Sequence, residues 1–255
     1  MIYSAMINDI PVEAEFSDQD VQEIYIPLIR KLRQMQENKK GRILIFLAAP
    51  PGVGKTTLAM FLQMLSETTE GLKKVTAIGI DGFHHYETYL NTHTTVRDGT
   101  EIPLIKVKGA PETFDLQKLT AGIQKIAAGE DCMWPTYSRI LHDPVENAVK
   151  VSGDIILLEG NYLLLDAPGW RDLKQYADMT VSLMPPDREI LKERLVNRKA
   201  ASGFSPEEAE AHVTFSDLYN ADLCMEHALP ADLVIQPKDI QERRTKWNCM
   251  QRFPQ

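Results

Sequence analysis

A turn rich in proline and glycine at residues 49–57, with the sequence A-P-P-G-V-G-K-T-T, carries the strongest chemical signal in the chain. Gly52 and Gly54 leave the backbone free to point N–H groups at a phosphate, and Lys55 can neutralise its charge. Ala49 stands where a Walker A motif usually begins with glycine, and the second half of that motif is intact. The turn predicts a site for nucleotide phosphates formed by Pro51, Gly52, Val53, Gly54, Lys55, Thr56 and Thr57.

Two carboxylates follow apolar segments that have the length and composition of buried strands. Asp81 comes directly after residues 75–80, and Glu159 closes residues 154–159. Asp81 is placed to accept the proton of an alcohol that attacks a phosphate, although an aspartate here could also only cap a turn. Glu159, with the Thr56 hydroxyl, is placed to hold Mg²⁺ or its waters. The alternative is that its carboxylate only makes hydrogen bonds with its neighbours at the strand end.

Aromatic and histidine side chains come directly after Asp81. Phe83, His84 and Tyr86 are therefore expected to form walls of a pocket for the acceptor. The neighbouring His84 and His85 do not predict a metal site, because adjacent side chains point apart and no third ligand has suitable spacing.

Apolar runs predict strands at residues 42–49, 75–80, 154–159, 179–183 and 232–235, and a hairpin within 133–151. Helical spacing is found at 18–38, 57–65, 115–128, 187–201 and 206–227, whereas 92–114 is expected to be irregular. Strands that alternate with helices predict an α/β fold of three layers, with a mostly parallel sheet, helices on both faces and a small lid. We expect a single domain over residues 1–255, with an N-terminal helical segment at 1–40 and the lid and its following helix at 187–227. Residues 238–255 are left unassigned.

Composition limits the partners. A net charge of −8 argues against a nucleic-acid surface. The N-terminus lacks the pattern of a signal peptide, and no apolar run could span a membrane, so a cytoplasmic location without membrane contact is expected. The three cysteines, Cys132, Cys224 and Cys249, are far apart and are expected to be free thiols. The oligomeric state stays open, with a homodimer as the commonest closed assembly.

Five segments in order resemble the phosphoribulokinase/uridine kinase group, which includes pantothenate kinases. They are APPGVGKTT, DGFHHYE, KGAPETFD, PTYSRILHDP and LLEGNYLLL. The resemblance implies ATP and Mg²⁺ as cofactors, Asp81 as the base, and Tyr137, Arg139 and His142 beside the acceptor. It also implies that Arg194 and Arg198 neutralise the transferred phosphoryl group from a lid. A solvated Arg139 and a salt-bridged surface helix remain the alternatives for these arginines.

The motifs that are missing narrow the class of P-loop protein. The chain has no guanine-reading NKxD element and no LSGGQ-like signature, and a single acidic residue closes the strand at 154–159. We therefore expect an ATP-dependent kinase that phosphorylates a hydroxyl of a small metabolite such as a nucleoside, pantothenate or a sugar. The alternative is a regulatory ATPase that acts as a switch or assembly factor, which would not need Asp81 and its aromatic followers.

Overall fold

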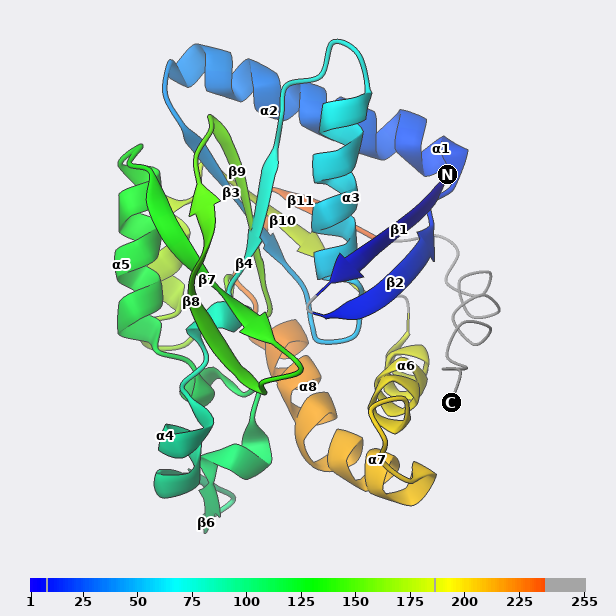
Figure 1. Cartoon of the computed structure of the whole chain (residues 1–255), viewed down its shortest axis with the longest axis vertical. Coiled ribbons are helices and arrows are strands. Elements are labelled where there is room, and N and C mark those ends of the chain that lie inside the picture. The colour runs from blue at the N-terminus through cyan, green and yellow to red at the C-terminus, as the bar shows by residue number, and fades with distance from the viewer. Residues whose placement is uncertain (8, 186, 237–255) are drawn as a thin grey trace.

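A parallel sheet of five strands lies at the centre of the computed structural model (Figure 1). The structure describes residues 1–7, 9–185 and 187–236. In spatial order the strands are β11 (Leu233–Ile235), β10 (Met179–Leu183), β3 (Ile43–Ala48), β9 (Ile155–Gly160) and β4 (Thr76–Gly79). All neighbouring pairs in this sheet run parallel. The five predicted strands are therefore confirmed to within one or two residues at each end.

Both faces of the sheet are buried under helices. Ile43 and Ile45 pack into a core shared with α2 (Ile26–Lys39) and α3 (Lys55–Thr68). Leu44 and Phe46, the alternate residues of β3, pack into a second core with α5 (Leu116–Ala127). Figure 1 shows α3 and α5 on opposite sides of the sheet. Because successive side chains of a strand point to opposite faces, a continuous apolar strand requires cover on both, and the predicted three-layer α/β fold is confirmed.

The remaining helices lie beyond the carboxyl ends of the strands or flank the sheet. They are α1 (Asp18–Asp20), α4 (Glu87–Thr92), α6 (Arg188–Ala200), α7 (Pro206–His212) and α8 (Leu218–Glu226). A π-helical turn, Val21–Tyr25, links α1 to α2 just before Pro27, and a second, Val213–Asp217, links α7 to α8. In Figure 1, α6, α7 and α8 gather at the lower end of the view. Within the described residues, no helix is long and apolar enough to cross a bilayer.

The expected helical segment at residues 1–40 is wrong in its first part. Strands β1 (Ile2–Ile7) and β2 (Ile10–Glu15) form an antiparallel hairpin, and the helix begins only at α1. Tyr3 of β1 lies edge-on against Phe61 of α3 with 5.9 Å between ring centroids. Apolar side chains such as Ile2 and Met6 lie on the exposed face of β1. The sequence therefore does not show the alternation of apolar and polar residues that predicts a strand.

The expected irregular stretch at 92–114 also contains regular structure. Strands β5 (Thr94–Arg97) and β6 (Thr100–Pro103) form a second hairpin, followed by 3₁₀ turns at Leu104–Val107 and Pro111–Thr113. The turn residues Asp98 and Gly99 both have positive φ angles, 50° and 75°, as a tight hairpin turn requires. The predicted hairpin at 133–151 is confirmed as β7 (Cys132–Ser138) and β8 (Asp143–Val151). The unassigned stretch at 238–255 lies outside the described residues, as does Cys249, while Cys132 and Cys224 are free thiols.

Candidate active site

The turn at residues 49–57 connects the end of β3 to the first residue of α3. Gly52 and Gly54 have φ angles of 82° and 97°, a region that favours glycine. Gly54 is the N-cap of α3 and offers no side chain to the first-turn N–H groups. Those N–H groups, at the positive end of the helix dipole, form an anion-binding site. The predicted residues Pro51 to Thr57 therefore lie together around the start of α3, in a geometry suited to binding phosphate.

Thr56 and Glu159 meet at the base of this turn. The Thr56 hydroxyl donates a hydrogen bond of 3.0 Å to Glu159 Oε1. The Glu159 side chain is buried, and its Oε2 has no hydrogen-bond partner among the described residues. A β-carbon at position 79 would lie 2.6 Å from Glu159 Oε1, so only glycine there leaves room for the carboxyl group.

Lys55 and Asp81 lie close enough to Glu159 for their charges to shift its pKa. Burial raises the pKa of Glu159 to about 7, and the charge of Asp81 acts in the same direction. The charge of Lys55 and the hydrogen bond from Thr56 oppose this shift. The ends of β4 and β9 and the start of α3 thus bring together the predicted base, the predicted phosphate-binding lysine and the predicted metal ligands. A hydroxyl and a carboxylate with an unpartnered oxygen are suitable donors for Mg²⁺.

Asp81 opens a 3₁₀ turn, Asp81–Phe83, directly after β4. The His84 ring Nδ1 donates to the Asp81 carbonyl at 2.8 Å, which fixes the tautomer that carries its proton on Nδ1. Burial lowers the pKa of His84, so the ring stays neutral near pH 7 although Asp81 acts in the opposite direction. A β-carbon at position 82 would lie 2.4 Å from the backbone of Pro135, so Gly82 lets β7 press directly on this turn.

The structure brings together only some of the residues expected beside the acceptor. The His84 ring lies 3.8 Å from the Phe114 ring and 5.6 Å from the Tyr137 ring, centroid to centroid. Phe83 is buried and packs against Trp134, so its ring faces the core. Tyr86 is exposed and donates to Glu146 on β8 at 3.1 Å.

Lys108 was missing from the predicted site. Its Nζ lies 5.2 Å from the centroid of the Tyr137 ring and donates to the carbonyl of His142 at 2.6 Å. The charge of Lys108 also lowers the pKa of His84, which places it near this ring. His142 thus contributes a backbone carbonyl here, while the residue as a whole is exposed. The sequence did offer a sign of Lys108, because this residue begins KGAPETFD, one of the five segments that resemble the kinase group.

The predicted arginines approach the site from α6. Burial lowers the pKa of Arg198, as does the charge of Arg139, while Asp217 and Asp81 raise it. Arg198 therefore lies near the predicted base Asp81, and Arg139 and Asp217 lie near Arg198. Arg194 is half-buried one helical turn earlier. Asp217 gave no signal in the sequence, because it lies in a stretch where charged residues are common.

Apolar contacts fix α6 against the phosphate-binding turn. A β-carbon on Gly52 would lie 2.9 Å from Leu195 and 3.2 Å from Leu191, and both leucines are buried. Helix α8 closes the site from a different direction, since the Cys224 thiol donates to the Asn161 carbonyl at 3.4 Å. Burial raises the pKa of Cys224 to about 12, so this thiol is unreactive at neutral pH.

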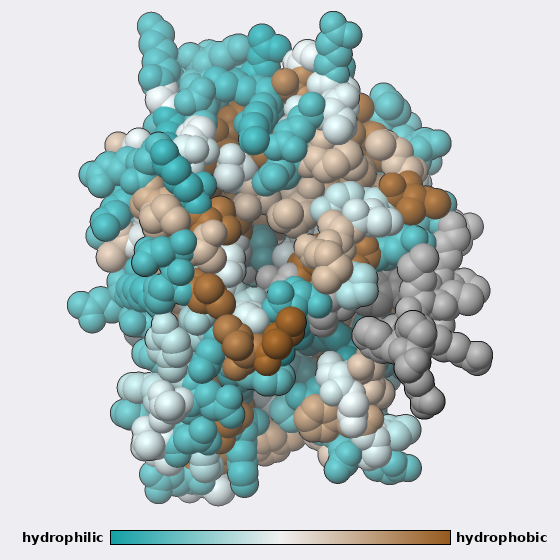
Figure 2. Space-filling model, in the orientation of Figure 1, coloured by the Kyte–Doolittle hydropathy of each residue, from teal (hydrophilic) through white to brown (hydrophobic). Residues whose placement is uncertain are grey.

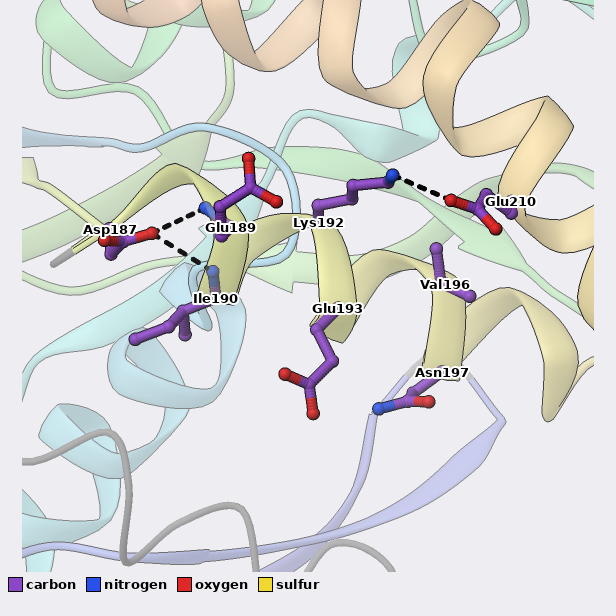
Figure 3. A pocket seen from close by; sticks show the side chains of 8 residues that line it. All are labelled: Asp187, Glu189, Ile190, Lys192, Glu193, Val196, Asn197 and Glu210. Carbon is purple, nitrogen blue, oxygen red and sulfur yellow. Dashed lines mark hydrogen bonds and ion pairs between the residues drawn. The ribbon is translucent and has the colours of Figure 1, made fainter.

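A pocket on the far side of α6 is separate from these residues. It is lined by Asp187, Glu189, Ile190, Lys192, Glu193, Val196, Asn197 and Glu210 (Figure 3). Lys192 donates to Glu210 at 2.8 Å, so α6 and α7 are joined across it. None of the predicted site residues lines this pocket, and the phosphate-binding turn remains the candidate site. Figure 2 shows a hollow near the centre of the face turned to the viewer, with hydrophobic residues on its lower rim.

The glycine turn between a buried strand and a helix, with strand-end carboxylates beside its lysine, defines a P-loop nucleotide-binding protein. The model of the Phosphoribulokinase / Uridine kinase family matches residues 44–240, and the chain belongs to this family. The resemblance found in the five sequence segments is thereby confirmed.

Individual relatives agree with this family. The chain is 36% identical over 231 residues to an uncharacterized protein, YggC, of Escherichia coli (strain K12), covering 90% of this chain and 93% of that protein. It is 29% identical over 164 residues to the pantothenate kinase of Lactococcus lactis subsp. lactis (strain IL1403), covering 57% of this chain and 51% of that kinase. A solved structure of a candidate fructose transport system kinase from Silicibacter sp. TM1040 has a TM-score of 0.74 and 31% identity, covering 83% and 98%.

Proposed function

We propose that this protein transfers the γ-phosphate of ATP to a hydroxyl group of a small metabolite. The observation that carries the proposal is the position of Asp81, next to Glu159 and the P-loop Lys55, at the carboxyl ends of adjacent parallel strands. In open α/β sheets this edge is where ligands bind. A carboxylate at that place can receive a proton from an attacking alcohol.

The chain's own groups supply the parts that phosphoryl transfer needs. Lys55 and the first N–H groups of α3 bind the phosphates, and Asp81 takes the proton of the acceptor hydroxyl. The acceptor oxygen then forms a bond to the γ-phosphorus, the bond to the β–γ bridging oxygen breaks, and ADP leaves. Arg198, with Arg194 on the same helix, neutralises the charge on the transferred group.

Thr56 and Glu159 are the residues that would hold Mg²⁺ in this reaction. The metal ion would neutralise phosphate charge when bound. The buried, unpartnered Glu159 Oε2 supports this assignment, because a buried carboxylate without a partner is costly.

The acceptor is proposed to be a small molecule rather than a nucleic acid, since the net charge of the chain is −8. The names of the family and of the relatives suggest uridine, pantothenate and fructose as the first acceptors to try. The second candidate function is a switch ATPase that hydrolyses ATP without an acceptor. The wall formed by His84, Tyr137 and Lys108 beside Asp81 favours the kinase, because hydrolysis alone needs no such wall.

The test is ADP formation, measured in a coupled assay against nucleosides, pantothenate, sugars, sugar phosphates and a reaction without acceptor. We expect one acceptor to raise ADP formation, and Asp81→Asn to lower kcat with it by about 100- to 10,000-fold. Nucleotide binding should survive in this variant, and Asp172→Asn, at an exposed site, is the matched control. Equal ADP formation with every acceptor and with none would instead support the switch ATPase.

A further inference from the structure

Several buried polar side-chain atoms have no hydrogen-bond partner among the described residues. They are Nε and Nη1 of Arg97, Oε2 of Glu159, Oδ1 of Asn161, Oγ of Ser216 and Oδ1 of Asn220. Buried polar groups in native proteins are nearly always paired, so each of these atoms needs an explanation. Glu159 and Asn161 belong to the nucleotide side of the site described above. Arg97, Ser216 and Asn220 have no role there and form a second group.

Arg97 is a charged side chain held almost completely out of water. Its side chain is 8% exposed, and its guanidinium carbon lies 4.3 Å from the centroid of the Tyr219 ring. Its ion pair with Glu112 joins Nη2 to Oε1 at 3.4 Å, which is long for a charge-assisted hydrogen bond. An arginine keeps its charge when buried. The N–H groups of Nε and Nη1 therefore need hydrogen-bond acceptors beyond those that the described residues supply.

Tyr162 connects Arg97 to the acceptor side of the site. Burial raises the pKa of Tyr162, the charges of Glu112 and Asp217 add to this, and Arg97 opposes it. The Tyr162 ring lies 5.7 Å from the Phe114 ring, and the centroid of the Phe114 ring lies 3.8 Å from that of His84, which follows Asp81.

Asn220, on α8, lies near the backbone group that binds Tyr162. The Tyr162 hydroxyl donates to the Gly109 carbonyl at 2.5 Å, and the Asn220 amide lies 4.0 Å from the β-carbon position of Gly109. Ser216 and Asn220 are one helical turn apart and flank Tyr219, which covers the guanidinium of Arg97. Ring contacts therefore run from His84 through Phe114 to Tyr162, and Gly109 and Asn220 link Tyr162 to the helix that carries Tyr219 and so to Arg97.

We infer that the acceptor carries an anionic group, a carboxylate or a phosphate, and that Arg97 binds it while Asp81 faces the hydroxyl to be phosphorylated. This inference rests on the proposed function. Ser216 and Asn220 would bind polar atoms next to the anionic group, since a hydroxyl and an amide can both donate and accept. A neutral acceptor would leave the buried guanidinium N–H groups unpaired, and this is a basis for selectivity.

The first experiment compares acceptors that differ only in the anionic group. Glycerate against glycerol and pantothenate against panthenol test a carboxylate, and fructose 6-phosphate against fructose tests a phosphate. We expect the anionic member of at least one pair to have a kcat/KM at least about tenfold higher, as removal of one charged hydrogen bond implies. A neutral member that is phosphorylated equally well would overturn the inference but leave the kinase function intact.

Calorimetric titration of the same pairs, in the presence of ADP and Mg²⁺, gives an answer that does not depend on turnover. Selective binding of an anionic member supports the inference even if no acceptor is phosphorylated, a result that would count against the proposed function alone. Equal binding of both members in every pair, or binding of neither, overturns the inference.

The second experiment separates binding by Arg97 from a purely structural ion pair with Glu112. Arg97→Gln should raise KM for the anionic acceptor at least about tenfold, with KM for ATP unchanged. Glu112→Gln removes the competing carboxylate and should lower that KM. If the pair is only structural, both variants will lower the melting temperature alike and the preference for the anionic member will persist. Arg97→Lys, which keeps the charge, is the reserve variant should Arg97→Gln fold poorly, and it should retain part of the preference.

Discussion

The buried carboxyl group of Glu159 has a pKa close to neutral, because burial and the nearby Asp81 both disfavour its ionised form. Before any ligand binds, this residue therefore changes charge in the pH range where enzymes usually work. Its hydrogen bond from Thr56 joins that change to the P-loop.

In the absence of nucleotide and metal, we predict that the stability of the protein depends on pH through Glu159. The pKa of Glu159 is about 7 in the folded protein, against 4.5 for an unperturbed glutamate such as that of the unfolded chain. At a pH between these two values, the folded state therefore holds a proton that the unfolded chain releases. The free energy of unfolding should fall as pH rises from about 4.5 to about 7. Thermal unfolding at closely spaced pH values measures this change in the free energy of unfolding. In the Glu159→Gln variant, the decrease that Glu159 causes between these pH values should be absent. An unchanged slope in the variant would contradict the assignment.

Residues with a motif around them could be predicted from the sequence, and isolated ones could not. Lys55, Thr56, Asp81 and Glu159 follow recognisable strands, so their positions at one edge of the sheet follow from the fold. Arg97 depends on a hairpin whose role no local pattern reveals. It lies against Tyr219, more than 100 residues later in the chain, and a contact of this kind cannot be found from the sequence.

At the scale of elements, two hairpins meet beside the site. Asp9, at the turn between β1 and β2, accepts hydrogen bonds from the Ser138 hydroxyl at 2.8 Å and from the Arg139 N–H at 3.1 Å. Ser138 Oγ also accepts from the Leu141 N–H at 3.2 Å, so the turn that carries Arg139 is held at both sides. Figure 1 shows the end of the β1–β2 hairpin reaching toward the β7–β8 hairpin.

We predict that Asp9→Ala weakens acceptor binding by loosening the turn that positions Arg139. Loss of exposed hydrogen bonds costs about 1 kcal/mol, which corresponds to a rise in acceptor KM of roughly fivefold, with kcat and the melting temperature nearly unchanged. Steady-state kinetics against the acceptor and ATP separately measure this effect. Glu13→Ala on the same hairpin is the control, and an equal change in both variants would show that Asp9 has no special part.

The buried strands β3 and β9 were predicted correctly because a mostly apolar run of about six residues between helical segments is too short for a helix and fits a parallel strand covered on both faces. In the two missed hairpins, β1 has one buried side chain, Tyr3, and β5 and β6 have none, so these strands lack that pattern. The Asp98–Gly99 pair did carry a turn signal for β5 and β6, since both residues adopt positive φ angles in a tight hairpin turn.

At the scale of the whole molecule, the N-terminal hairpin is joined to the P-loop helix by aromatic packing. The Phe16 and Phe61 rings are stacked with centroids 3.7 Å apart, and Tyr25 lies edge-on against both. Phe16 and Phe61 are both buried. The family model begins at residue 44, so this contact joins a segment outside the family match to α3, the helix that starts at the P-loop.

We therefore predict that the hairpin and the rest of the chain unfold together. Phe16→Ala should lower the free energy of unfolding by about 3–5 kcal/mol, the usual cost of removing a buried phenylalanine. Chemical denaturation followed by circular dichroism should show one transition at lower denaturant, whereas Met6→Ala, at an exposed position, should change little. Two separate transitions would contradict the expectation of a single domain.

The packing around Trp134 has a practical consequence. This tryptophan is buried, its indole N–H donates to the Gly79 carbonyl at 2.8 Å, and its ring lies against Phe83, two residues after Asp81. Gly79 in turn contacts the carboxyl group of Glu159. Trp134, one of three tryptophans in the chain, is thus a natural fluorophore at the border between both carboxylate-bearing strand ends. In a variant with Trp170 and Trp247 replaced by phenylalanine, its emission will report movement of either strand end without a chemical label.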